Sequence, residues 1–136
     1  DLRGAITYLL NHDATTGEKV GTVGFCMGGA LSLYAASKNP QVGACVVFYG
    51  IHPNVKPDLA NLKAPVLGIY AELDAYVPPA TVKELESQLK EHGKSVEMLI
   101  YPKLDHGFFN DTREVYNETA ANDAWRRTIA LFREHL

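Results

Sequence analysis

A cysteine flanked by glycines is the first feature of the sequence that could carry chemistry. Cys26 stands in the run Gly24-Phe25-Cys26-Met27-Gly28, a G-x-nucleophile-x-G pattern between an apolar stretch and a helical one. Such a run predicts a nucleophile on a tight strand-to-helix turn, with glycines where larger side chains would meet neighbouring backbone. The helix start beyond it favours the thiolate and aims the Met27 N–H at a developing oxyanion. A Gly-rich turn with a structural cysteine explains these five residues about equally well.

Two further residues have the types and positions that complete a catalytic site. Asp74 and His106 each follow an apolar stretch, so both are expected at the carboxyl ends of strands, where α/β sheets place functional groups. An acid there can orient a histidine, which can act as base toward the cysteine and as acid toward a leaving group. Glu72 competes with Asp74 for the acid role. A solvated loop carboxylate and a surface histidine are the alternatives without chemistry.

The order of the three residues along the chain strengthens this interpretation. Nucleophile, acid and histidine follow one another in the order known for a nucleophile on a strand-to-helix turn. Each separation leaves room for about one strand–helix unit or a little more. Among the other histidines, His52 follows the second apolar stretch and could line the same site, whereas His12, His92 and His135 lie in loops or at helix ends.

The rest of the chain predicts the elements that must position these residues. Continuous apolar stretches predict four strands, at residues 20–25, 44–49, 65–71 and 96–101. Helical periodicity predicts helices at residues 2–10, 28–38, after Pro79 with Thr81 and Glu84 as a capping box, and at 119–136. Residues 51–63 are expected to form a loop with one helical turn. Apolar strands that alternate with helices imply a parallel α/β sheet covered on both faces.

Composition limits the function classes further. The 136 residues suit a single domain, and a net charge of −3 gives no sign of a nucleic-acid or anionic-membrane surface. The apolar stretches are far shorter than the roughly 20 residues that a membrane helix needs. Cys26 and Cys45 show no metal-ligand spacing and no convincing disulfide pattern, so we expect no metal and a reducing cytoplasm. Cys45 is expected to be a buried small hydrophobe.

Four stretches of the sequence resemble the dienelactone hydrolase family of α/β hydrolases, also called carboxymethylenebutenolidases. They are Gly24-Phe25-Cys26-Met27-Gly28-Gly29, Phe48-Tyr49-Gly50, Ala71-Glu72-Leu73-Asp74-Ala75-Tyr76-Val77-Pro78 and Asp105-His106-Gly107-Phe108. The resemblance implies hydrolysis of a small ester or lactone, without a cofactor, through an acyl-cysteine intermediate. It implies that Cys26 attacks, that His106 transfers the proton and that Asp74 orients His106. The Met27 N–H would supply half of the oxyanion hole.

Six residues near these motifs are candidates for substrate binding, namely Phe25, His52, Tyr76, Phe108, Asn110 and Arg113. Family members with dienelactone activity carry an arginine four residues after the histidine, and it helps to hold the substrate carboxylate. Here that position is Asn110, with Arg113 nearby. The resemblance therefore implies the reaction class and leaves the particular substrate open.

The resemblance covers only the second half of the family domain. Residues 1–136 are therefore expected to form one truncated domain, the C-terminal half of an α/β-hydrolase fold, with about four parallel strands and helices on both faces. The strand at 20–25 would then have an unpaired apolar edge, which is a pairing hazard. We expect a complementing N-terminal half or a second copy of the chain to cover it. Two other functions stay open: a catalytically idle half-domain acting as an oligomerising module, and a redox thiol at Cys26.

Overall fold

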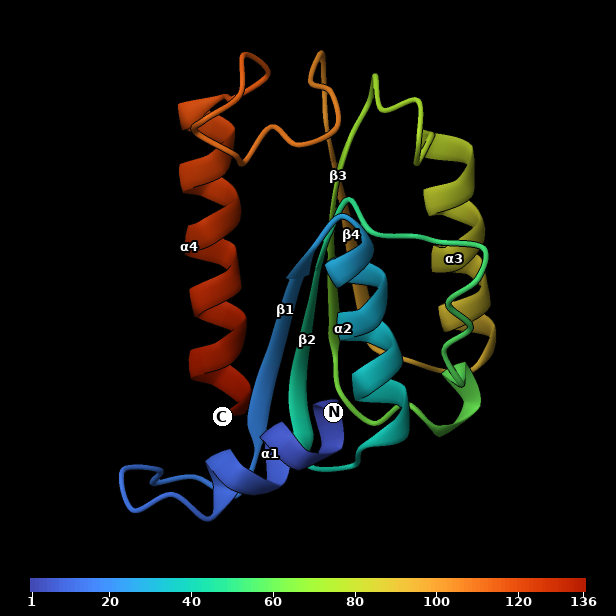
Figure 1. Ribbon diagram of the computed structural model, residues 1–136. Coiled ribbons are helices and arrows are strands. Elements are labelled where there is room, and N and C mark those ends of the chain that lie inside the picture. The colour runs from blue at the N-terminus through green and yellow to red at the C-terminus, as the bar shows by residue number, and fades with distance from the viewer.

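The computed structural model describes residues 1–136 and has a four-stranded parallel sheet at its centre (Figure 1). The strands lie in the order β1-β2-β3-β4, and each pairs in parallel with the next. Their bounds are β1 Val20–Phe25, β2 Val42–Phe48, β3 Val66–Ala71 and β4 Val96–Tyr101. Because all four strands run the same way, their carboxyl ends meet at one edge, the upper one in Figure 1. The predicted parallel sheet is confirmed.

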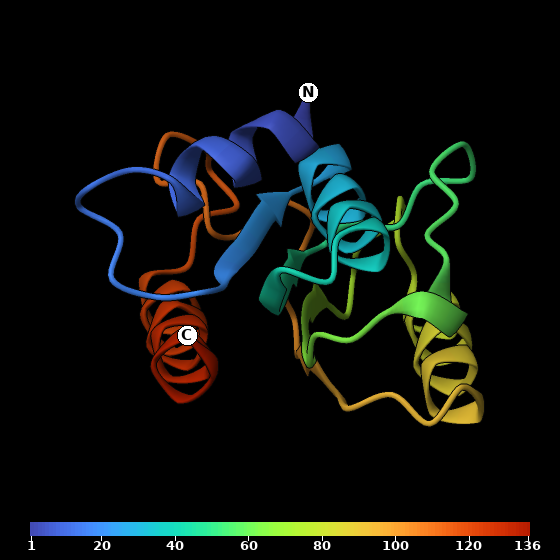
Figure 2. The same ribbon diagram turned by 90° about the horizontal axis from the view of Figure 1, so that it is seen from below.

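Helices cover both faces of this sheet, as the sequence predicts. Helices α2 (Met27–Lys38) and α3 (Pro79–Glu91) lie on one face and α4 (Glu118–His135) on the other (Figures 1 and 2). Helix α1 (Leu2–Leu10) buries only Ile6 and lies at the end of the sheet away from the strands' carboxyl ends. The short 3-10 helix η1 (Leu59–Asn61) is the single helical turn expected after β2. None of these helices combines the length and the apolar character that a membrane span requires.

The two central strands differ sharply from the edge strand β1. Every residue of β2 and β3 is buried, which explains why both read as unbroken apolar runs. Strand β1 pairs with β2 alone, and its Val23 and Phe25 side chains stay 40% and 39% exposed. The structure thus has an open apolar edge at β1, where the sequence predicts one.

Helix α3 begins at a different residue from the one predicted. Pro78 is its N-cap and makes no side-chain capping bond, while the N–H groups of Thr81 and Val82 donate to the Pro78 carbonyl at 2.9 Å and 3.3 Å. Thr81 therefore lies in the first turn, and the predicted capping box with Glu84 is wrong. The reason is Pro79, whose fixed φ suits the first helical position and whose missing N–H needs no acceptor there.

Candidate active site

Cys26 lies on the turn that joins β1 to α2, with backbone angles φ 55° and ψ −126°. A non-glycine residue with positive φ is strained, and such strain is typical of functional positions. The turn is held because the Cys26 N–H donates to the Phe48 carbonyl at 3.0 Å and the Cys26 carbonyl accepts from the Gly29 N–H at 2.9 Å. Met27 is the first residue of α2, so its N–H has no acceptor within the helix and is available to an anion at Cys26.

The glycines around Cys26 are required to different degrees. A Cβ at Gly24 would overlap the Gly28 carbonyl oxygen, so only glycine fits there. A Cβ at Gly28 would meet nothing within 4 Å, and the expectation that both flanking glycines are needed is wrong for this position. The next residue, Gly29, is the one at which a side chain would meet neighbouring backbone. A Cβ at Gly29 would lie 2.9 Å from the Phe48 carbonyl oxygen, because α2 packs directly on the end of the sheet.

The His106 imidazole contacts both of the other candidate catalytic residues at once. Its Nε2 lies 3.2 Å from Cys26 Sγ and its Nδ1 lies 2.7 Å from Asp74 Oδ2. An ionised carboxylate can only accept a hydrogen bond, so Nδ1 carries the proton that it donates to Asp74. In the neutral ring, Nε2 then offers its lone pair to the thiol. The arrangement allows a proton to pass from Cys26 to His106.

The Asp74 carboxylate is held so that one oxygen is left for His106. Its side chain is fully buried, and the backbone N–H groups of Tyr76 and Val77 donate to Oδ1 at 2.8 Å and 2.9 Å. Oδ2 is thereby turned toward the imidazole. These three hydrogen bonds compensate the carboxylate for its loss of water.

Backbone bonds between two loops bring Asp74 and His106 together. In the loop after β3, the Glu72 N–H donates to the carbonyl of Tyr101, the last residue of β4, at 3.0 Å. The Leu73 N–H donates to the carbonyl of Leu104, in the loop after β4, at 2.8 Å. The Glu72 carboxylate accepts from the Lys103 N–H at 2.8 Å. Glu72 is thus engaged with backbone, and Asp74 is the acid that faces the histidine.

A cavity of about 550 Å³ opens over Cys26 and His106. Its wall contains Met27 and five of the six candidate substrate-binding residues, Phe25, His52, Tyr76, Asn110 and Arg113. Phe108 is absent from the wall, and its assignment to substrate binding is corrected. Its side chain is fully buried, with its ring against those of Tyr49 and Tyr101. Gly107, with φ 87°, turns the chain after His106 so that the next side chain enters the core.

Tyr49 is a residue of this site that the sequence reasoning did not assign. It is buried, lines the cavity and has φ 39°, and its ring centroid lies 4.8 Å from that of His106. Burial, with a smaller contribution from nearby Cys26, raises the pKa of Tyr49 to about 12, so its hydroxyl stays protonated at neutral pH. The available signal was its place directly after β2, which matches the places of Asp74 and His106 after their strands.

Three polar side chains on the cavity wall are available to a ligand in different ways. Arg113 forms no salt bridge within the chain. Nδ1 of His52 accepts from the Asn54 N–H at 3.2 Å, so Nε2 of the neutral ring is a donor. The side-chain oxygen of Asn110 accepts from Thr112, which leaves the Asn110 amide nitrogen as a donor. The wall therefore presents hydrogen-bond donors and one cation. No three His, Cys, Asp or Glu side chains gather in the chain as metal ligands would.

A parallel α/β sheet that carries a cysteine, an acid and a histidine beyond the ends of β1, β3 and β4 defines an α/β-hydrolase-like protein. Comparison with known proteins agrees with this class. The chain belongs to the dienelactone hydrolase family, whose family model matches residues 1–136.

Individual relatives are considerably longer than this chain. "Protein usf" of Aquifex pyrophilus is 38% identical over 136 residues, which cover 98% of this chain and 59% of that protein. A protein of Saccharolobus solfataricus named "Putative carboxymethylenebutenolidase" is 40% identical over 118 residues, which cover 85% of this chain and 44% of that protein. The chain thus spans about half the length of these relatives.

Solved structures of similar proteins superimpose on most of this chain. A dienelactone hydrolase-like promiscuous phosphotriesterase from metagenomic libraries superimposes with a TM-score of 0.85 and 25% identity, over 98% of this chain and 59% of that one. A crystal structure from Klebsiella pneumoniae, titled as a putative dienelactone hydrolase, has a TM-score of 0.76 and 36% identity, over 82% of this chain and 50% of that one.

Proposed function

We propose that this chain supplies the catalytic residues of a hydrolase that cleaves a small ester or lactone through an acyl-cysteine intermediate, without a cofactor. The observation that carries the proposal is one imidazole in contact with both Cys26 Sγ, at 3.2 Å, and Asp74 Oδ2, at 2.7 Å, beneath an open cavity. Membership of the dienelactone hydrolase family supports the reaction class.

Acylation begins with a proton transfer within the cysteine–histidine pair. The Cys26 thiol gives its proton to His106 Nε2, and the thiolate attacks the carbonyl carbon of the substrate. The carbonyl oxygen takes the electron pair and accepts a hydrogen bond from the Met27 N–H. When the intermediate collapses, the carbon–oxygen bond breaks and the His106 Nε2–H protonates the leaving alkoxide. Asp74 stabilises the imidazolium through both of these transfers.

Deacylation uses the same residues in the reverse roles. His106 takes a proton from a water molecule, and the resulting hydroxide attacks the thioester carbonyl. The carbon–sulfur bond breaks, the carboxylic acid leaves, and the proton on His106 returns to Cys26. A lactone follows the same course, except that its alcohol remains attached to the acyl group and leaves with it.

The cavity wall supports a small substrate with a polar or anionic group beside the ester. A volume of about 550 Å³ is in the usual range for small-molecule sites. Arg113 and the His52 Nε2–H would bind that polar group, and the Phe25 side chain would pack against an apolar part. Cys26 and Cys45 are both free, which supports our assignment of the protein to a reducing compartment such as the cytoplasm.

We further propose that the open edge of β1 is covered by a complementing N-terminal half of the domain. Val23 and Phe25 on β1, together with Tyr116 and Trp125, line an apolar groove of about 490 Å³ beside that edge. Large exposed side chains also occur on α1 and α2, including Leu9 and Leu31. Exposed apolar patches of this kind mark contact surfaces. Sedimentation of the isolated chain tests this, because a stable monodisperse monomer contradicts it and a symmetric dimer identifies a second copy as the covering element.

The function is tested with p-nitrophenyl acetate and the 136-residue chain. We expect release of p-nitrophenol together with an acetyl group on Cys26, detected by peptide mass spectrometry and absent from Cys26→Ala. A folded chain that forms no adduct would favour the idle oligomerising half-domain. The redox-thiol alternative is separated by His106→Gln, which should abolish ester turnover if the chain is a hydrolase and leave reactivity toward peroxide intact if it is not.

A further inference from the structure

Two tyrosine rings pack against the imidazole of His106. The ring centroid of Tyr49 lies 4.8 Å from that of His106 with an interplanar angle of 55°, and the centroid of Tyr76 lies 5.1 Å away at 60°. Tyr49 comes from the end of β2 and Tyr76 from the loop after β3. We call these two residues the tyrosine pair. Together with Cys26 and Asp74 they leave only 12% of the His106 side chain exposed.

The hydrophobic core does not explain why an aromatic residue stands at position 76, because the Tyr76 side chain lies outside the core. The residue is 83% exposed, yet its backbone is fixed because its N–H donates to Asp74 Oδ1 at 2.8 Å. The bond that holds the catalytic acid therefore also places an aromatic ring against the catalytic histidine. An apolar ring exposed to this extent gains little from burial, so the contact with His106 is the interaction to explain.

Both centroid separations lie within the range of about 6 Å over which a tyrosine ring attracts a cation. A neutral imidazole gains only packing from such a contact, whereas an imidazolium also gains the electrostatic attraction. We propose that the tyrosine pair stabilises the imidazolium of His106 and thereby shifts the Cys26–His106 pair toward thiolate and imidazolium. The inference rests on the proposed function, because it assigns Tyr49 and Tyr76 as positioning residues of the same site.

Some charged groups around His106 favour its protonated form, the imidazolium, and others oppose it. Asp74, at 2.7 Å from Nδ1, and Asp105, whose Oδ1 accepts from the His106 N–H at 2.6 Å, both favour the imidazolium. Arg113 on the cavity wall opposes it, and His52 across the cavity opposes it when protonated. The Tyr49 hydroxyl stays neutral, since burial raises its pKa to about 12. The pair therefore adds an attraction that comes from its rings.

Alkylation of Cys26 by iodoacetamide tests this inference without any ester chemistry. The thiolate displaces iodide from the CH₂ carbon, so the rate follows the thiolate population and needs no oxyanion hole. Cys45 is fully buried, and peptide mass spectrometry assigns the adduct to Cys26. We expect Tyr76→Ala to slow alkylation about twofold to fivefold near neutral pH, where the thiolate–imidazolium pair competes with the neutral thiol–imidazole pair. At the lowest pH the rate should stay unchanged, because His106 is then an imidazolium whether Cys26 is a thiol or a thiolate. Tyr76→Phe, which restores the ring without the hydroxyl, should restore the wild-type profile.

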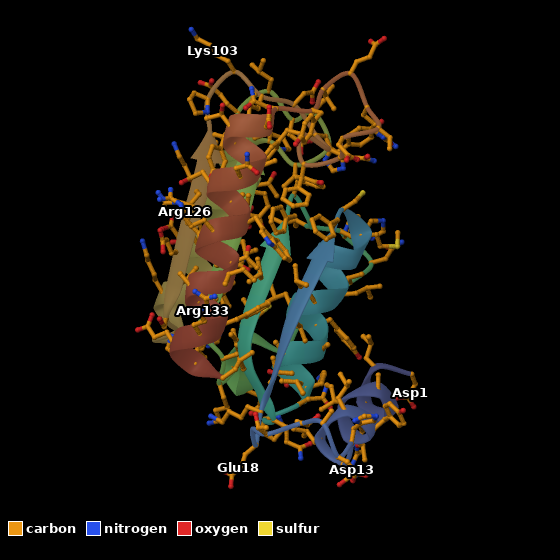
Figure 3. All side chains as sticks on the ribbon, turned by 90° about the vertical axis from the view of Figure 1, so that its left-hand side faces the viewer. Asp1, Asp13, Glu18, Lys103, Arg126 and Arg133 are labelled. Carbon is orange, nitrogen blue, oxygen red and sulfur yellow. The ribbon has the colours of Figure 1, made fainter.

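The chain offers a matched control in a second tyrosine–histidine pair. Tyr8 is 67% exposed and its ring lies 5.7 Å from that of His12, at the end of α1. Figure 3 shows Asp1 and Asp13, which bracket that region, at the end of the molecule opposite Lys103 in the loop that leads to His106. Tyr8→Ala should therefore leave the alkylation profile unchanged.

The possible outcomes separate this inference from the proposed function. Coincident profiles for wild type and Tyr76→Ala overturn the tyrosine pair, and so does a Tyr76→Phe variant that behaves like Tyr76→Ala. If Tyr76→Ala changes the alkylation profile but the wild-type protein shows no ester turnover, the result supports the tyrosine pair and contradicts the proposed function. A wild-type profile identical to that of His106→Gln overturns both, because no cysteine–histidine pair would then form.

Discussion

Asp74 Oδ2 and His106 Nδ1 meet at 2.7 Å although the two residues stand 32 positions apart in the chain. The contact depends on two loops that follow β3 and β4 and are joined to each other by backbone hydrogen bonds. Because the Asp74 side chain is fully buried, its charge acts on His106 with little screening by solvent.

Replacing this acid should impair catalysis far more than folding. Asp74→Asn keeps the shape of the side chain but can no longer enforce the Nδ1–H tautomer or stabilise the imidazolium, so we expect kcat for p-nitrophenyl acetate to fall by about 10³- to 10⁴-fold. Asp13→Asn, an exposed substitution beyond α1, is the control. A loss of less than tenfold for Asp74→Asn would remove this residue from the mechanism.

The two glycines that flank Cys26 should respond oppositely to alanine. Gly24→Ala forces a Cβ into the Gly28 carbonyl oxygen, and we expect it to lower the free energy of unfolding by about 3 kcal/mol or more. Gly28→Ala meets open space in the first turn of α2, and we expect no loss and a gain of up to about 1 kcal/mol. Urea denaturation of both variants measures the difference, and equal destabilisation would contradict the turn geometry.

Phe108 should behave as a core residue. Its side chain is fully buried against Tyr49 and Tyr101, so we expect Phe108→Ala to lower the free energy of unfolding by about 3–5 kcal/mol. Asn110→Ala, on the exposed cavity wall nearby, removes only the hydrogen bonds from Thr112 and should lower it by about 0.5–1.5 kcal/mol. Thermal or urea unfolding distinguishes the two. An unchanged stability in Phe108→Ala would return this residue to the candidates for substrate binding.

Cys45 should make the folded state lose stability in alkaline solution. Burial raises the pKa of its thiol from 9.0 to about 11, so the folded protein retains the proton over a range in which the unfolded chain releases it. The contribution of the Cys45 thiol to the free energy of unfolding is therefore complete below pH 9.0 and is lost as the pH rises toward about 11. In that interval this one group lowers the free energy of unfolding by about 1.4 kcal/mol per pH unit.

Cys45→Ala removes the titrating thiol, so comparing this variant with the wild type isolates its effect. The difference in free energy of unfolding between wild type and variant should shrink from pH 9.0 upward, while a constant difference would show that the Cys45 thiol does not titrate as described. Tyr49 and Tyr101 also have raised pKa values, but Cys45 causes neither shift, so their contributions are common to both proteins and cancel in the difference.

Local sequence was sufficient to predict the strands and to single out the candidate catalytic residues. A strand buried on both faces must be apolar throughout, so β2 and β3 could be predicted from unbroken apolar runs. Cys26, Asp74 and His106 could be singled out because the residue that follows such a run lies at the strands' common carboxyl edge. These inferences depend only on neighbours along the chain.

Only the tertiary structure decided which side chains meet. The choice of Asp74 over Glu72 depended on the Lys103 N–H, which engages Glu72 from a loop about thirty residues away along the chain. The burial of Phe108 and the tyrosine contacts on His106 likewise depended on the directions that distant backbone segments give to side chains. Apolar periodicity reports whether a residue is buried, whereas the identity of its contacts is set by how the elements pack, which no local pattern encodes.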